Sequence, residues 1–235
     1  MLSKFVLSSV IAALAVAYPA QAAPQQMPKR DTIELSKVAQ LRIADTAVDR
    51  FKLLPKDEDF MFDFSKSQIP VATASNFPAL VGSGASFSLA SLPGCHMAFL
   101  HLHPRASELF AVTSGRVVTE MVPEAGVVTA DGKQRVIRTD LSAGMLTIFP
   151  QGSFHTQVNP NCETANISAF FTAEDFGAGL VADQTFALSD DVIIRTFGES
   201  IPGEDIEKIR HAIPGTMAIL VDECMAKCNK TKRHI

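Results

Sequence analysis

The chain has 235 residues, of which 47% are hydrophobic and 20% charged. This composition excludes a disordered chain and suits one medium globular domain with extensions, or at most two small ones. The net charge is only −4 at pH 7. Phosphate binding needs clustered lysine and arginine, so we expect no nucleic-acid partner.

Residues 1–22 have the pattern of a secretory signal peptide. A lysine precedes an apolar run over residues 5–17, which is too short to cross a bilayer, and Ala20-Gln21-Ala22 is typical of a cleavage site. Residues 23–30 end in Lys29-Arg30, which is either a propeptide processing site or a charged pair in a loose N-terminus. No later segment has the length and apolarity of a membrane span. We therefore expect a secreted, extracellular protein without a membrane partner.

The remaining sequence divides into three parts. Residues 31–59 form an arm of helical or irregular character. Residues 60–200 contain many short strands separated by turn residues, which predicts an all-β sandwich or barrel. Residues 201–235 have apolar residues at helical spacing and predict two helices divided by Pro214-Gly215. The predicted strands are residues 86–91, 98–102, 108–112, 116–122, 134–140, 145–149 and 166–171.

Four metal-binding side chains stand at two places in the β region. His101 and His103 are two apart, so they share one face of a strand, and Glu108 follows after a turn. His155 begins a later strand, after the turn Pro150-Gln151-Gly152. Three imidazoles and one carboxylate suit Mn, Fe, Co, Ni, Cu or Zn better than Ca or Mg. On a six-coordinate ion this set leaves two adjacent places for water or substrate.

These stretches resemble the two motifs of the cupin superfamily, and more narrowly those of germin-like proteins of the secreted, spherulin-like type. The first motif, H-x-H-x4-E-x6-G, is satisfied by His101, His103, Glu108 and Gly115. The second, G-x5-P-x-G-x2-H-x3-N, is satisfied by Gly144, Pro150, Gly152, His155 and Asn159. The resemblance implies a cupin jelly-roll β-barrel that holds Mn2+ on His101, His103, Glu108 and His155. Fe, Zn or another divalent ion would also suit the set.

Other residues bear on the pocket. Germins that oxidise oxalate carry Asn three residues before the first histidine; here that residue is Ala98, which cannot donate a hydrogen bond. Gln157 matches a germin glutamine, and we expect it either to line the pocket or to hydrogen-bond in the core. Asn159 is expected to be structural. We expect His96 in a loop and not as a ligand. Arg105 is expected to pair with a carboxylate rather than to attract an anionic substrate.

Four cysteines and two glycosylation sequons fit an exported protein. We favour a Cys95–Cys162 bridge, because both residues lie just outside the motifs that the cupin fold brings together, and a short-range Cys224–Cys228 bridge. The sequence alone leaves all three pairings open. Asn229 lies in a polar tail and is the more accessible sequon, whereas Asn166 would be hidden if it faces a sheet interior.

The resemblance implies a metal-dependent extracellular oxidoreductase, and the residues leave open whether the chain is an enzyme. Its substrate would be superoxide, or a small carboxylate such as oxalate; superoxide dismutation depends least on the residue at position 98. The alternative is a non-enzymatic storage, wall or stress protein of spherulin type that binds metal. A receptor for a sugar or other small ligand is a third interpretation. In germin relatives the tail helices clamp neighbouring subunits, so we expect a homo-oligomer, a trimer or hexamer.

Overall fold

The computed structural model describes residues 34–228. The predicted signal peptide, the Lys29-Arg30 pair and the sequon at Asn229 lie outside these residues. Their predictions therefore stay predictions. Within the described chain, no helix combines the length and apolarity that crossing a bilayer requires.

Short strands are the most abundant regular structure in the described chain, which confirms the predicted all-β class. In chain order they are β1 (Val71–Ala72), β2 (Ser86–Leu92), β3 (His96–Ala98), β4 (His101–Leu102), β5 (Glu108–Ser114), β6 (Arg116–Val122), β7 (Ile137–Ser142), β8 (Leu146–Phe149), β9 (Phe154–Val158), β10 (Ala165–Phe171), β11 (Gly179–Leu180) and β12 (Ala218–Leu220).

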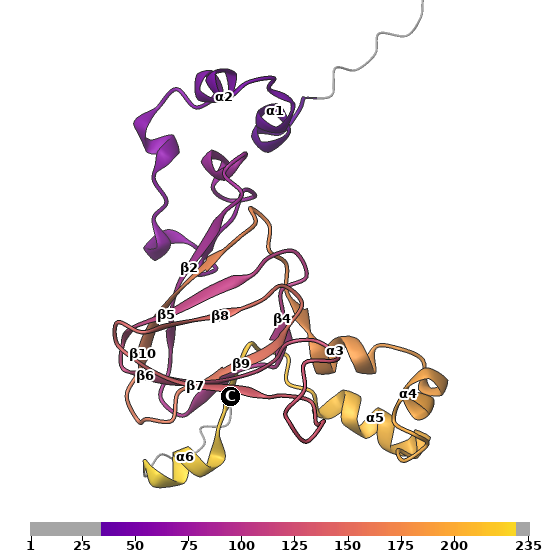
Figure 1. Cartoon of the computed structure of the whole chain (residues 1–235). Helices are drawn as coiled ribbons and strands as arrows, with labels where there is room; N and C mark the ends of the chain where they lie inside the picture. Colours follow the sequence, from indigo (N-terminus) through magenta and orange to yellow (C-terminus); the bar gives the residue numbers. More distant parts are fainter. Residues whose placement is uncertain (1–33, 229–235) are drawn as a thin grey trace, which may run out of the picture. The chain divides into compact units, whose positions relative to one another are not determined.

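The strands form two sheets that curve around a common interior (Figure 1). The first has the order β1-β2-β10-β5-β8, and the second has the order β11-β4-β9-β3-β12, with β6 paired to both β9 and β7. All of these pairs are antiparallel. The core is contributed by both sheets and consists of Leu92, Ala106, Phe110, Val112, Val117, Met121, Leu141, Phe149, Ala165, Ala169 and Phe171.

Strand alternation decides which side chains enter this interior. In β5, Glu108, Phe110 and Val112 are buried while Leu109 is exposed, because successive side chains of a strand point to opposite faces. The carboxylate of Glu108 is therefore placed on the same inward face as two core residues. Burial of Phe110 and Val112 stabilises the strand, and the same alternation buries the carboxylate of Glu108.

The N-terminal arm contains two helices, α1 (Lys37–Ile43) and α2 (Ala47–Leu53), followed by the short 3-10 helices η1 (Asp57–Phe60) and η2 (Phe64–Lys66). The hydroxyl groups of Ser36 and Thr46 accept hydrogen bonds from the first turns of α1 and α2 and start these helices. The predicted helical character of the arm is confirmed.

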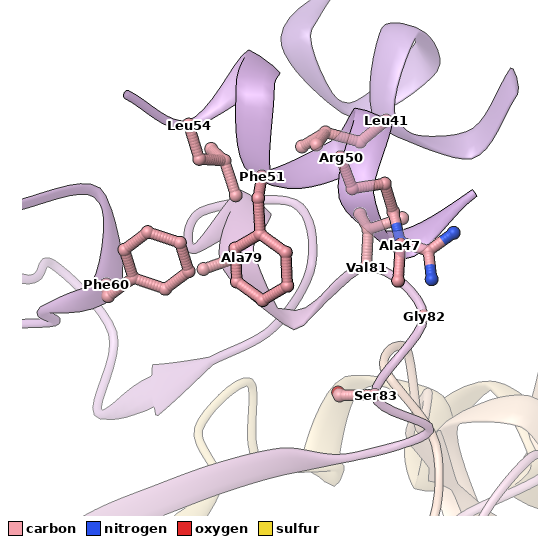
Figure 2. Close-up of a pocket in the computed structure, with 10 residues that line it drawn as sticks. All are labelled: Leu41, Ala47, Arg50, Phe51, Leu54, Phe60, Ala79, Val81, Gly82 and Ser83. Atoms are coloured by element: carbon pink, nitrogen blue, oxygen red, sulfur yellow. The ribbon is translucent and has the colours of Figure 1, made fainter. Parts of the chain in front are cut away.

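A hollow of about 220 Å3 lies between the arm and the segment after η3 (Pro78–Leu80). Figure 2 shows the rings of Phe51 and Phe60 flanking Ala79 at its wall. Arg50 is the only ionisable residue among those described that line it. The described residues that line the hollow thus include no histidine, cysteine or carboxylate that could ligate a metal, and we interpret it as the contact between the arm and the segment around η3.

The C-terminal region is only partly as predicted. The expected helices are present as α5 (Gly203–Ala212) and α6 (Asp222–Lys227), separated by a break that includes Pro214-Gly215. Two further helices, α3 (Val181–Phe186) and α4 (Asp190–Thr196), were not predicted, and both contact α5. Residues 217–221 were predicted to be helical, but Ala218–Leu220 forms β12, which pairs with β3. Three apolar residues fit the repeat of a helix and that of a strand equally well. They form a strand because the edge of β3 offers backbone hydrogen bonds.

The predicted disulfide pairing was wrong. The bridges join Cys95 to Cys224 and Cys162 to Cys228, so neither Cys95–Cys162 nor Cys224–Cys228 forms. Cys224 and Cys228 are one turn apart around α6, and both face the loops outside the two motifs. Each therefore meets a partner there: the Cα–Cα distances are 5.2 Å and 5.6 Å. The motif-flanking cysteines are neighbours, as expected, but the tail helix lies between them.

The structure decides the direction of Asn166, which the sequence left open. It lies on β10 with an exposed side chain, on the outer face of the first sheet rather than toward its interior. Its amide accepts a hydrogen bond from Ser91 and donates one to Ser114 on the two adjacent strands. Burial therefore does not hide this sequon.

We expect a non-reducing peptide map to contain Cys95–Cys224 and Cys162–Cys228 peptides. Replacing both Cys95 and Cys224 by serine should lower the free energy of unfolding by about 2–5 kcal/mol, because the bridge closes a loop of 129 residues and restricts the unfolded chain. Denaturant unfolding under non-reducing conditions measures the loss. A Cys95–Cys162 peptide in the map would contradict the observed pairing.

Candidate metal centre

The four predicted ligands come together inside the barrel from separate strands. His101 on β4 lies directly opposite His155 on β9 in the antiparallel ladder. Glu108 begins β5, where it pairs with Phe149 of β8 and Phe171 of β10. His103 follows β4 immediately. The ligand atoms of the four side chains all lie within 4.8 Å of one another.

The cluster is shielded from water. His101, His103, Glu108 and His155 are between 1% and 6% exposed. The Oε2 atom of Glu108 lies 3.0 Å from Nε2 of His103 and 3.1 Å from Nε2 of His155. Ionisable groups this buried require a charge partner within the protein or a bound ion.

Backbone carbonyls fix the tautomer of each histidine. The Nδ1 atom of His101 lies 2.6 Å from the carbonyl oxygen of Phe99, that of His103 lies 2.7 Å from Gly177, and that of His155 lies 2.9 Å from Ser153. A carbonyl oxygen can only accept, so Nδ1 carries the proton in all three rings. In the neutral rings the free electron pair is therefore on Nε2, and those of His103 and His155 are directed toward the carboxylate.

This arrangement needs a positive charge at its centre. If the rings are neutral, two Nε2 electron pairs face a carboxylate oxygen at close range, which is repulsive. A proton on Nε2, giving an imidazolium, or a metal cation converts the repulsion into attraction. The donor set and the carbonyl contacts, which orient metal-bound histidines in general, fit a cation.

The distances also fit an ion with octahedral bonds. Neighbouring ligands of an octahedral ion with bonds of ~2.1 Å lie about 3.0 Å apart. The two Nε2–Oε2 distances are 3.0 Å and 3.1 Å. The four residues thus form a set that can hold a divalent metal ion.

Aromatic rings hold the imidazoles in place. The ring of Phe149 stacks on His155 at a centroid distance of 4.2 Å, and the rings of Phe171 and Phe176 contact His103 edge-on at 4.9 Å and 5.0 Å. These contacts exclude water from the cluster and restrict ring rotation. No sequence pattern singles out these three phenylalanines, because only the closed barrel brings them to the histidines.

Burial and neighbouring charges shift two pKa values in the metal-free cluster. Burial lowers the pKa of His101 to about 4, with a smaller lowering effect from His155. Burial raises the pKa of Glu108, but its hydrogen bonds with His103 and His155 outweigh this effect and lower it to about 2. At neutral pH His101 is therefore an uncharged ligand and Glu108 a carboxylate, which are the forms that bind metals.

A cavity of about 430 Å3 begins at the cluster. Its walls include Ala98 and Gln157, two of the residues singled out in the sequence. Gln157 lies two residues after His155 on the same buried face of β9 and is 4% exposed. The side-chain amide of Gln157 makes no hydrogen bond to any residue in the described part of the chain, and therefore faces the cavity with free donors and an acceptor.

Asn159, in contrast, has a structural role, as expected. Its side-chain amide donates to the carbonyl oxygens of Leu92, Pro93 and Glu163, and its oxygen accepts from the backbone of Asn161. It does not reach the cavity.

Two other predicted residues stand apart from the cluster. His96 lies in β3, with Nδ1 close to the carbonyl of Gly94, and so is not a ligand; it is in a strand and not in the predicted loop. Arg105 pairs with the carboxylate of Asp175 at 2.8 Å, as expected. Neither residue supplies charge to the cavity.

The comparison with known proteins decides the family. The sequence model of the cupin family matches residues 53–202. The chain belongs to the cupin family. Spherulin-1A of Physarum polycephalum is 35% identical to this cupin over 201 residues, which are 81% of this chain and 78% of spherulin-1A.

Two further similarities extend this relationship. A germin-like protein of Arabidopsis thaliana, subfamily 2 member 3, is 30% identical over 152 residues, which are 63% of this chain and 65% of that one. The structure of recombinant oxalate oxidase in complex with glycolate matches with a TM-score of 0.57 at 17% identity, covering 68% of this chain and 83% of the other. At this identity the structural match shows the jelly-roll fold of the cupin and nothing more specific. The predicted germin-like, spherulin-like cupin is confirmed.

The metal-free cupin should lose stability as the pH falls. The pKa of His101 is about 4 in the folded state and about 6.5 in the unfolded chain, so below pH 6.5 the unfolded chain binds a proton that the folded chain does not. The contribution of His101 to the free energy of unfolding is complete above pH 6.5 and is lost as the pH falls through 4. Between pH 7 and 5 the loss should be about 2 kcal/mol.

Urea unfolding of chelator-treated protein at pH 7 and pH 5 measures this loss. The Glu108 carboxylate adds little in this range, because its pKa is about 4.5 in the unfolded chain and lower in the folded chain, so comparison with a His101 variant measures the part due to His101. The variant His101→Gln, treated in the same way, should show a smaller decrease. Equal decreases in both proteins would contradict the assignment.

Proposed function

We propose that this cupin is a secreted, manganese-binding oxidoreductase that acts on a small molecule at the metal. The observation that carries the proposal is the set of three Nε2 atoms and one carboxylate oxygen held around a common point by backbone carbonyls. The two disulfides support export, because such bridges persist in oxidising compartments.

The residues of the chain have separate tasks in this proposal. His101, His103, Glu108 and His155 would hold the ion, and Glu108 offsets part of its charge. A bound manganese ion would supply one-electron chemistry by alternating between the 2+ and 3+ states. The phenylalanine rings around His103 and His155 keep water away from the ligands, and the free amide of Gln157 is available to orient a bound molecule.

Superoxide dismutation is the reaction that agrees best with the residues of the cavity wall. It needs few hydrogen-bond donors beside the metal, and the wall offers a methyl group at Ala98. Oxidation of oxalate ranks second, because Ala98 offers a carboxylate no donor and only the amide of Gln157 remains. Oxalate decarboxylation ranks third.

The alternative is a non-enzymatic metal-binding storage, wall or stress protein of spherulin type. The similarity to spherulin-1A over 81% of the chain favours this candidate. In that case the same ligand set would mainly stabilise the folded state by binding an ion that the unfolded chain does not bind.

The chain purified after expression in a secretory host supplied with manganese should contain one manganese ion per chain. His103→Ala should lose the metal, melt at a lower temperature and lose superoxide dismutation, because one of four ligands is gone. The matched control His96→Ala changes a histidine outside the cluster and should keep all three properties. Elemental analysis, thermal melting and a superoxide assay give the answer.

Two results would count against the proposal. Turnover that survives in metal-free His103→Ala protein would exclude the cluster as the reactive centre. Full manganese loading without turnover on superoxide or on any small carboxylate would favour the spherulin-type alternative.

We also propose that the cupin forms a homo-oligomer, a trimer or hexamer. The outer face of the first sheet carries a row of apolar side chains that are directly opposite one another on four strands, each more than a third exposed: Phe87, Phe170, Leu109 and Ile148. A contiguous exposed apolar patch of this kind is typical of a surface that another subunit covers. In a hexamer that contains two-fold axes, two copies of this face can cover each other.

Leu109→Glu should reduce the oligomer to a smaller species, because a charge would be buried in the contact. Val128→Glu is the matched control: Val128 is also exposed and apolar but lies outside this face, between β6 and β7. Sedimentation or light scattering measures the mass. A wild-type monomer at micromolar concentration would contradict the proposal.

A further inference from the structure

The cavity beside the metal ligands is larger than the small substrates considered above require. A dry protein cavity of about 150 Å3 holds benzene, which has as many heavy atoms as oxalate. The present cavity has a volume of about 430 Å3. Superoxide or oxalate would fill only a minor part of it.

The space exists because small side chains line it. Ala90, Ala98, Ala169, Ala178 and Ala218 contribute to the wall from different parts of the fold. Larger residues at these places would fill the interior and increase core packing. The alanines leave room next to the ligand cluster instead.

The remaining wall is apolar. Ile69, Ile167, Leu92 and Met217 belong to it. Ile69 and Met217 are 55% and 44% exposed, whereas Leu92 is buried, so the first two mark the mouth of the cavity. A molecule that enters past them would lie along apolar side chains with its inner end at the metal ligands.

Polar groups are almost absent from this wall. Among the described residues that line it, the only ionisable ones are the metal ligands His101, His103 and Glu108. Ser88 lines it too, but its hydroxyl already donates to the carbonyl of Pro70 at 2.8 Å. The amide of Gln157 is therefore the one buried polar side chain that faces the cavity without a partner in the described chain.

We infer that the small carboxylate that this site accepts is a monocarboxylate with an apolar body, which binds with its carboxylate at the metal and with its body in the cavity. The inference rests on the proposed metal site. A second carboxylate, as in oxalate, would face apolar walls and one amide, with no cation to balance its charge. An apolar body instead gains free energy from every methylene that it buries.

A homologous series of monocarboxylates tests the inference on the full chain loaded with manganese. Acetate, butyrate and hexanoate are titrated at pH 7 by calorimetry, together with oxalate. Affinity should rise about fourfold per added methylene, which corresponds to ~0.8 kcal/mol each, so hexanoate should bind on the order of 100-fold more tightly than acetate. Oxalate should bind more weakly than hexanoate.

Variants of the wall locate the binding. Ala98→Leu should weaken hexanoate at least tenfold and leave acetate unchanged, because it shortens the space beyond the metal. Ala98→Asn should raise the affinity for oxalate relative to hexanoate by adding a donor. Ala226→Leu, on an exposed position of α6, is the matched control and should change nothing.

Equal affinities along the series, or oxalate as the tightest ligand, would overturn the inference even if the variants did not fold. The metal content measured before titration separates this failure from failure of the proposed function. If the protein holds manganese at full occupancy but the affinity does not depend on the length of the carboxylate, only the proposed substrate class is wrong. Absence of manganese from the wild-type protein defeats both.

Discussion

Three hydrogen bonds from imidazole Nδ1–H groups to backbone carbonyls are the constraint on which the rest of the site depends. Because each carbonyl fixes one tautomer, Nε2 is the free nitrogen of each ring, and those of His103 and His155 face Glu108. Phe99 and Ser153 each stand two residues before their histidine, whereas Gly177 is 74 residues from His103. Strand pairing in the closed barrel then brings the separate segments together, so metal binding at this cluster would be coupled to folding.

The barrel interior has two chemically different ends. At one end, Phe149 and Phe171 pack against imidazoles and produce a dry, rigid cluster. At the other, alanines leave space that a more tightly packed core would fill. In the proposed function, the rigid polar end would hold the metal, and the open apolar end would decide which molecules can reach it. The fold is the same as in relatives, so the choice of substrate lies in the side chains of the wall.

The C-terminal tail is part of this site and not only an extension of it. Its two disulfides fasten α6 to the loops outside the cupin motifs, through Cys95 and Cys162. Between α5 and α6, β12 adds to the edge of β3, and Met217 and Ala218 thereby reach the cavity. Fixing the tail covalently keeps these two residues in place as part of the cavity wall.

The sequence by itself determined the β class, the metal ligands and their inward direction. Those features follow from local rules: His101 and His103 share a face at a spacing of two, and Pro150 and Gly152 turn the chain before His155. The disulfide partners, the outward direction of Asn166, the strand β12 and the cavity were decided by tertiary structure. Each depends on which segments lie beside one another. Cys224 meets Cys95 only because α6 packs between the two loops, and residues as distant in the chain as Ile69 and Met217 share a cavity only because the barrel closes.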